Sequence, residues 1–92
     1  MSDDGSRVAL DSADFWPEDT DEAEGLVLDW YVSEGSQVDD GDLLCEFQVE
    51  KIDVEVAAPT SGTVDEIVLE KDAELERGDT LAYLMPERES ER

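Results

Sequence analysis

Residues 43–57 read LLCEFQVEKIDVEVA, and they place a lysine between two stretches with the pattern of β-strands. Residues 43–47 are mostly apolar, and residues 53–57 alternate polar and apolar side chains with period two, as a half-buried strand does. Lysine is rare in this chain, which contains only Lys51 and Lys71. The stretch therefore predicts a β-hairpin that presents Lys51 at its tip.

On both sides of this hairpin the chain repeats itself. The segment that begins at Gly25 can be laid over the segment that begins at Gly62, which is an offset of 37 residues. The same offset relates the pairs Val27/Val64, Trp30/Ile67, Val38/Leu75, Gly41/Gly78, Leu44/Leu81 and Phe47/Leu84. Two copies of one supersecondary unit predict a pseudo-symmetric domain, since a solenoid needs three or more.

The repeat bears on the segment of residues 71–77, which has helical propensity on its own. Its aligned partner, residues 33–40, contains a glycine and has the composition of a turn. We therefore expect residues 71–77 to be a loop. Gly41 and Gly78, each followed by aspartate, are expected to supply a positive φ where a loop re-enters a strand.

The spacing of the shared apolar residues predicts bent strands. Val27 is followed by Trp30, and Leu44 by Phe47, in steps of three that the second copy repeats. A regular strand cannot direct residues three apart to the same face, whereas a β-bulge or sharp bend restores both to the core. The predicted fold is all-β, a flattened barrel-sandwich of two small antiparallel sheets related by a pseudo-twofold axis.

The composition is strongly acidic, with 28 Asp and Glu against 6 Lys and Arg and a net charge of −22. Nucleic acids and anionic membranes would repel such a chain, so neither is expected as a partner. Because 39% of the residues are hydrophobic and lie in regular runs, we expect a folded domain rather than a disordered one. The acidity is typical of a salt-loving cytoplasm, where the Debye length falls to about 3 Å at 1 M salt.

The chemistry available to the chain is narrow. The sequence has no histidine and one cysteine, Cys45, which excludes Ser-His-Asp and Cys-His nucleophiles and zinc sites of the usual Cys/His type. Residues 19–25 faintly resemble a calcium loop but lack the context of an EF-hand, so no metal site is predicted. We expect no catalytic residues, Cys45 as a small core or edge residue of a strand and, from the single cysteine and the absence of a signal peptide, a cytoplasmic protein.

One domain is expected over residues 7–85, because 92 residues supply a single modest core. We expect a flexible N-terminus at residues 1–6 and a charged tail at residues 86–92. Within the domain, residues 8–10 are a candidate first strand. In the acidic loop that follows, the aromatic pair at positions 15 and 16 is expected to pack back on the edge of the domain.

Residues 24–84 resemble the biotinyl/lipoyl attachment domain, and within it the lipoyl domains of 2-oxoacid dehydrogenase complexes of the dihydrolipoamide acyltransferase type. The matching positions, in order, are Glu24, Gly25, Trp30, Gly41, Asp42, Leu44, the lysine turn, Val54, Glu55, Val56, Ala58, Pro59, Gly62, Val64, Glu66, Ile67, Gly78 and Leu81. The family fold consists of two small antiparallel sheets with the modified lysine at one hairpin tip. The internal repeat agrees with this fold independently.

The lysine turn favours lipoic acid over biotin. Lipoyl domains typically read Glu-Thr-Asp-Lys-Ala and biotinyl domains Ala-Met-Lys-Met, whereas this chain has Gln48, Val49, Glu50, Lys51 and Ile52. The acid directly before Lys51 is lipoyl-like, while Gln48, Glu50 and Ile52 replace the usual Glu, Asp and Ala. The resemblance implies that Lys51 carries covalent lipoic acid and that Glu50 and Gln48 contribute to recognition of the turn.

A lipoyl domain implies a swinging-arm carrier that is not itself an enzyme. Its partners would be a lipoate-attaching enzyme, a 2-oxoacid dehydrogenase that acylates the arm, and a dihydrolipoamide dehydrogenase that reoxidises it. Two alternatives stay open: a biotin carboxyl carrier, and an unmodified interaction module of the same fold. A glycine-cleavage carrier is disfavoured because that family's domain is usually longer and has extra terminal helices.

Overall fold

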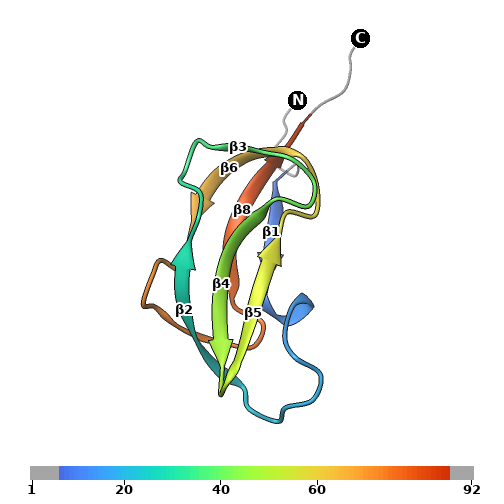
Figure 1. The fold of residues 1–92 in the computed structure, drawn as a ribbon. Helices are drawn as coiled ribbons and strands as arrows, with labels where there is room; N and C mark the ends of the chain where they lie inside the picture. The colour runs from blue at the N-terminus through green and yellow to red at the C-terminus, as the bar shows by residue number, and fades with distance from the viewer. Residues whose placement is uncertain (1–6, 88–92) are drawn as a thin grey trace.

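The two halves of the chain build two four-stranded antiparallel sheets, seen in a computed structural model that describes residues 7–87 (Figure 1). The elements in chain order are β1 (Val8–Asp11), the short 3-10 turn η2 (Ser12–Asp14), β2 (Glu24–Trp30), β3 (Gln37–Val38), β4 (Leu43–Val49), β5 (Ile52–Ala57), β6 (Gly62–Ile67), β7 (Glu74–Glu76) and β8 (Thr80–Pro86). The all-β prediction is confirmed. β8 ends at Pro86, one residue beyond the expected end of the domain. The expected flexible N-terminus, residues 1–6, and most of the expected charged tail, residues 88–92, lie outside the described residues.

The strand order shows the pseudo-symmetry that the repeat predicted. One sheet has the order β1-β8-β6-β3 and the other β5-β4-β2-β7. Strands β2, β3 and β4 of the first copy correspond to β6, β7 and β8 of the second, and each takes the same position in its sheet. The two edge strands β1 and β5 complete the match, so each sheet contains strands from both halves of the domain.

Both copies carry the predicted bulges at equivalent residues. The pairing of β2 with β4 shifts register between Val27 and Asp29, and the pairing of β6 with β8 shifts between Val64 and Glu66. The bulged residue is therefore position 28 in one copy and Asp65, 37 positions later, in the other. Since a bulge adds one residue to one strand, it turns side chains three apart toward the same face.

The segment of residues 71–77 differs from the expected loop. It contains no helix, but Glu74–Glu76 forms strand β7, which pairs with the first residues of β2. Leu75 at its centre is 1% exposed, because edge pairing satisfies the backbone and lets this side chain enter the core. The expectation was wrong at these three residues because the sequence pattern gives no sign of so short an edge strand.

A single apolar core fills the space between the sheets. Its largest fully buried side chains are Phe47, Leu10, Leu44, Leu75, Leu81 and Leu84. Trp16 also belongs to this core, with 5% of its surface exposed and its ring centroid 5.4 Å from that of Phe47. The aromatic pair thus packs back on the domain as expected. Phe15 is partly buried, whereas Trp16 lies in the core and not at the edge of the domain that was predicted.

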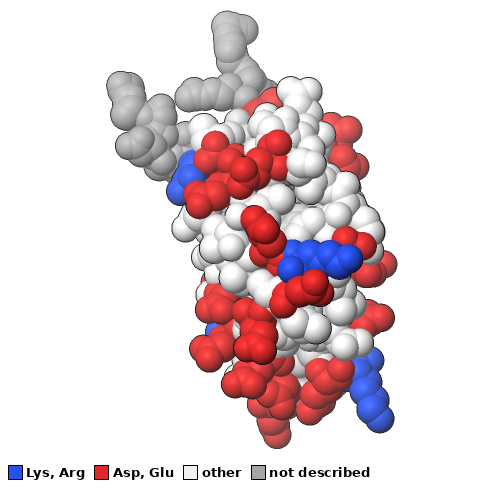
Figure 2. Space-filling model, turned by 90° about the vertical axis from the view of Figure 1, so that its left-hand side faces the viewer, with Lys and Arg blue, Asp and Glu red and all other residues white. Residues whose placement is uncertain are grey.

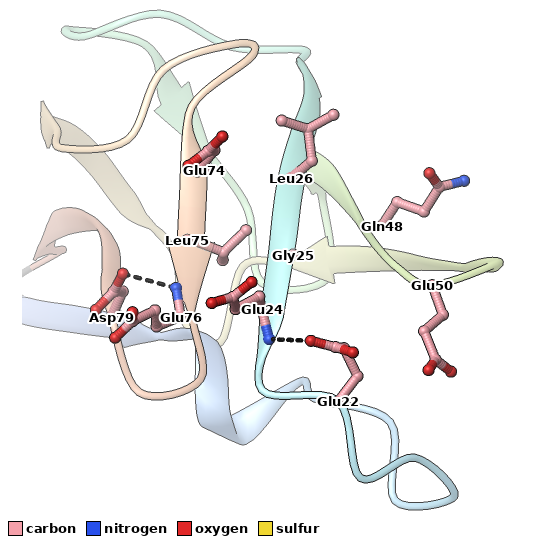
Figure 3. A pocket seen from close by; sticks show the side chains of 10 residues that line it. All are labelled: Glu22, Glu24, Gly25, Leu26, Gln48, Glu50, Glu74, Leu75, Glu76 and Asp79. Atoms are coloured by element: carbon pink, nitrogen blue, oxygen red, sulfur yellow. Dashed lines mark hydrogen bonds between the residues drawn. The ribbon is translucent and has the colours of Figure 1, made fainter.

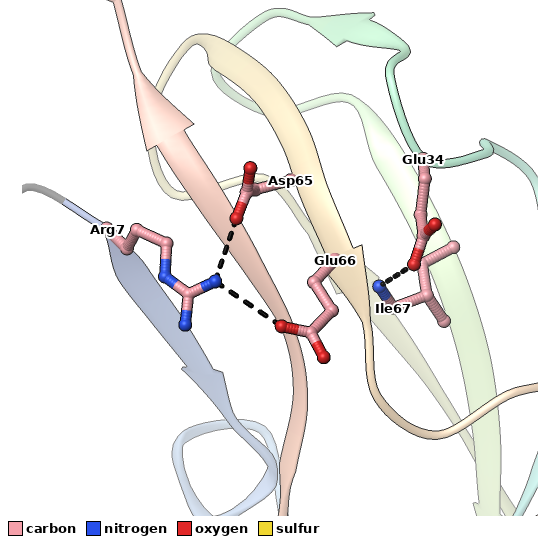
Figure 4. A network of polar contacts seen from close by, with 5 residues as sticks. All are labelled: Arg7, Glu34, Asp65, Glu66 and Ile67. Carbon is pink, nitrogen blue, oxygen red and sulfur yellow. Dashed lines mark hydrogen bonds and ion pairs between the residues drawn. The ribbon is translucent and has the colours of Figure 1, made fainter. Parts of the chain in front are cut away.

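Arg7 joins the start of β1 to the bulge of β6 (Figure 4). Its guanidinium lies 3.9 Å from the centroid of the Tyr83 ring and binds Asp65 Oδ2 at 2.8 Å and Glu66 Oε1 at 3.3 Å. The hydrogen bond with Asp65 is the main reason that the pKa of Arg7 is raised. These contacts fasten one of the few basic side chains at the end of the domain where β1 begins and β8 ends.

The β4–β5 hairpin projects at the opposite end of the elongated molecule from the start of β1 and the end of β8 (Figure 1). Gly41 and Gly78 both have positive φ, 93° and 99°, at the turns that lead into β4 and β8, as predicted. No helix within residues 7–87 is long and apolar enough to cross a membrane.

Candidate functional site

The lysine turn is fixed by the ladder of β4 and β5. Val49 pairs with Ile52 as the last step of the ladder, which leaves Glu50 and Lys51 as a two-residue turn. Val49 is fully buried, so the base of the turn is anchored in the core, while Lys51 is exposed. Glu50 has a φ of 59°, and tight hairpin turns require a positive φ at this first central position. The structure therefore presents the Lys51 side chain on a short turn that Val49 anchors in the core on the β4 side.

Gln48 is held on the surface of the hairpin. Its side-chain amide donates a hydrogen bond of 2.9 Å to Asp53 Oδ1, and the two residues are direct cross-strand partners. This contact braces the two strands one step below Val49 and Ile52. Gln48 thus lies next to the turn but is engaged with the neighbouring strand.

Glu50 is tied to a segment that the sequence did not connect with the site. Its carboxylate accepts a hydrogen bond of 3.2 Å from the Thr20 hydroxyl, in the loop between η2 and β2. Thr20 is 30 residues away, and no motif or repeat position marks it. The buried Trp16 near the start of the same loop was the one available sign that this loop folds back on the domain.

An acidic groove of about 600 Å³ runs beside the turn (Figure 3). It is lined by Glu22, Glu24, Gly25, Leu26, Gln48, Glu50, Glu74, Leu75, Glu76 and Asp79. Six of these residues carry carboxylates and none is basic. Figure 2 shows acidic side chains gathered over the lower end of the molecule, the end at which the hairpin lies in Figure 1.

The other candidate groups lack the geometry of a site. Cys45 is fully buried, and burial raises the pKa of its thiol to about 12, so it is not a thiolate nucleophile at neutral pH. Lys71 lies in the loop between β6 and β7, beside a separate hollow lined by Trp30 and Ile67. In the described part of the chain, no cluster of three or more His, Cys, Asp or Glu side chains has the arrangement to hold a metal ion. The hairpin is therefore the candidate site.

A family model described as "Biotin-requiring enzyme", the Biotin_lipoyl family, matches residues 19–84, and the chain belongs to this family of biotinyl/lipoyl attachment domains. It is 36% identical over 61 residues to the dihydrolipoyllysine-residue acetyltransferase component of the pyruvate dehydrogenase complex of Staphylococcus aureus, and 33% identical to that of Staphylococcus epidermidis. These alignments cover 66% of the chain but 14% of each relative, so the chain spans about a seventh of their length.

Solved structures agree with the fold. The lipoyl domain of the 2-oxoglutarate dehydrogenase complex from Azotobacter vinelandii matches with a TM-score of 0.63 and 29% identity, over 75% of this chain and 85% of that one. A single-chain, multi-domain long-chain acyl-CoA carboxylase matches with a TM-score of 0.74 over 98% of this chain and 8% of that one, but at 17% identity this likeness shows the fold alone. The sequence relatives and the lipoyl domain put the chain on the lipoyl side of the family, whose domains are non-catalytic carriers.

Proposed function

We propose that this protein is a lipoyl carrier domain in which lipoic acid is joined to Lys51 as an amide. The observation that carries the proposal is the position of Lys51, exposed at the two-residue turn of a hairpin in which Val49, just before the turn, is fully buried. The resemblance to lipoyl domains implies an attachment lysine at a hairpin tip, and Glu50 supplies the acid that precedes the lysine in lipoyl domains.

The residues present fit a covalently attached arm. The Lys51 side chain is exposed, so an arm attached there can extend away from the domain. Gln48 and Asp53 brace the strands below the turn and hold the backbone of the attachment site in place. When bound, a lipoyl group supplies a dithiolane that accepts an acyl group together with two electrons.

The contribution of the chain itself is presentation. A lysine on a fixed hairpin keeps the end of the arm within a small volume, and such tethering raises the effective concentration at each enzyme that the domain visits. The partners would be a 2-oxoacid dehydrogenase, a dihydrolipoamide dehydrogenase and the enzyme that attaches lipoate, all in the cytoplasm. Glu50 and Gln48 would contribute to recognition by the attaching enzyme.

The test is the intact mass of the full chain purified from its own cells, followed by fragmentation across residues 48–53. We expect a mass increase of one lipoyl group located on Lys51, absent in Lys51→Arg and retained in the matched variant Lys71→Arg. Both lysines are exposed, so neither change should alter the fold. A biotin-sized increase would make the domain a carboxyl carrier, and an unmodified Lys51 would leave an interaction module of the same fold.

A further inference from the structure

The Thr20 hydroxyl makes two hydrogen bonds, one to the lysine turn and one within its own loop between η2 and β2. It donates to Glu50 Oε1 at 3.2 Å and accepts from the Glu22 backbone N–H at 3.0 Å. Within residues 7–87, the bond to Glu50 is the one side-chain hydrogen bond that links the two turn residues to another segment. Thr20 thus occupies a junction that the proposed carrier function does not require by itself.

The loop that carries Thr20 is anchored in the core. The Trp16 ring packs against Phe47, which lies on the strand that leads into the lysine turn. The Trp16 indole N–H also donates a hydrogen bond of 2.9 Å to the carbonyl of Glu22, which holds the far side of the loop. Because the loop is fixed around Thr20, the threonine hydroxyl has a defined position from which to hold Glu50.

Electrostatic repulsion acts against this contact. Glu22 from the loop, Glu24 from the start of β2 and Glu50 from the turn line the same acidic groove (Figure 3). Like charges that share a groove favour separation of the segments that carry them. Glu50 also has a positive φ, which is costly for a residue other than glycine. A donor facing the Glu50 carboxylate offsets both effects, because a hydrogen bond to an ionised acceptor is stronger than one between neutral groups.

We propose that Thr20 is a positioning residue for Lys51, which holds the Glu50 carboxylate against the anchored loop and so keeps the lysine turn in one orientation. The consequence for modification rests on the proposed function. The attaching enzyme joins Lys51 Nζ to the carboxyl carbon of lipoate as an amide, using ATP, with AMP and pyrophosphate as leaving groups and loss of the amine proton. A turn that is already oriented does not have to be ordered during this encounter.

The first test uses the unmodified full chain and does not depend on lipoylation. Heteronuclear NOE values of the Glu50 and Lys51 amides should fall in Thr20→Val, which keeps the shape and removes the donor. They should return to the wild-type values in Thr20→Ser, which keeps the hydroxyl. Thr63→Val, on β6 near the opposite end of the domain, is the matched control and should leave the turn unchanged. Equal NOE values in Thr20→Val and wild type would overturn the proposal.

The second test measures lipoylation by a purified lipoate–protein ligase supplied with lipoate and ATP. The KM for the domain should rise about two- to tenfold in Thr20→Val, the range expected for loss of one exposed hydrogen bond, with kcat unchanged. Thr20→Ser should restore the KM. An unchanged KM, or a fall in kcat alone, would contradict positioning of the free domain. If neither the wild-type domain nor any variant is lipoylated, the proposed function fails. The NOE comparison, which uses the unmodified chain, still decides the role of Thr20.

Discussion

Asp72 occupies in the second half of the chain the position that Gly35 occupies in the first, and both have a left-handed φ, 74° and 91°. Position 72 follows position 35 by the 37-residue offset of the repeat. The Asp72 backbone N–H donates a hydrogen bond of 2.9 Å to the carbonyl of Val27, so the turn keeps its geometry although its residue is not glycine. The second copy of the repeat therefore retains a strained conformation that the first copy relieves with glycine.

Replacing this aspartate with glycine should stabilise the protein. We expect Asp72→Gly to raise the free energy of unfolding by about 0.5–1 kcal/mol, because relief of the left-handed conformation exceeds the added freedom of the unfolded chain. Urea unfolding at high salt measures the change. Asp72→Asn is the matched control, since it removes the charge and keeps a side chain. Equal gains in the two variants would show that charge rather than backbone strain is responsible.

The repeat explains why so much of the fold could be predicted. A spacing of three between buried residues, found twice, predicted bulges that the structure places at position 28 and at Asp65. Such reasoning works where side-chain burial dictates the backbone. It failed at Glu74–Glu76, where backbone hydrogen bonds to β2 create a strand too short to leave a periodic pattern.

The site was predictable only in part, for a related reason. Lys51, Glu50 and Gln48 are neighbours along the chain, so the turn could be predicted from local sequence, but their roles remain predictions. Thr20 reaches Glu50 only because Trp16 enters the core and turns the loop toward the hairpin. Contacts that depend on the path of an irregular loop leave no local signal in a single sequence.

Carboxylates face each other across the outer side of one sheet. Glu46 is the direct cross-strand partner of Glu55 on one side and of Asp29 on the other. Glu46 also accepts a hydrogen bond of 2.9 Å from the Tyr31 hydroxyl, which raises the pKa of Tyr31. Directly opposed like charges destabilise a sheet, and salt screens them when they are exposed.

Reversing one of these charges should therefore stabilise the protein mainly at low salt. We expect Glu55→Lys to raise the free energy of unfolding by about 0.5–1 kcal/mol at 0.1 M KCl, because an opposed like-charge pair becomes an opposite-charge pair. Thermal unfolding measured from 0.1 to 2 M KCl should show the gain shrinking as salt rises. Glu70→Lys makes the same change in net charge in a loop outside the ladder. A gain from Glu70→Lys as large as that from Glu55→Lys would assign the effect to net charge alone.

Trp16 should contribute more to stability through its N–H than Trp30 does. Trp16 is buried and donates to the carbonyl of Glu22, whereas the half-buried Trp30 donates to the carbonyl of Leu69 at 2.7 Å. We expect Trp16→Phe to lower the free energy of unfolding by about 1–3 kcal/mol, since it leaves a part-buried carbonyl without its donor. Trp30→Phe should cost less because the Trp30 side chain is already partly exposed to water, whereas Trp16 is buried. Chemical denaturation compares the two, and a larger loss in Trp30→Phe would show that the order is wrong.

The buried thiol of Cys45 should make stability fall at high pH. In the folded chain burial raises the thiol pKa to about 12, whereas the unfolded chain releases this proton near its ordinary value of 9.0. Between these values the folded state binds more protons, so the free energy of unfolding decreases as pH rises, by at most about 1.4 kcal/mol per pH unit. Below pH 9 the contribution is constant.

Urea unfolding measured from pH 7 to 11 should show this decline in wild type and a flatter curve in Cys45→Ala. The substitution itself should lower the free energy of unfolding by about 1 kcal/mol at pH 7, because it leaves a small cavity. The raised pKa of Tyr31 acts in the same direction and persists in Cys45→Ala, so the difference between the two curves isolates the thiol. Parallel curves would show that the Cys45 thiol does not resist ionisation in the folded core.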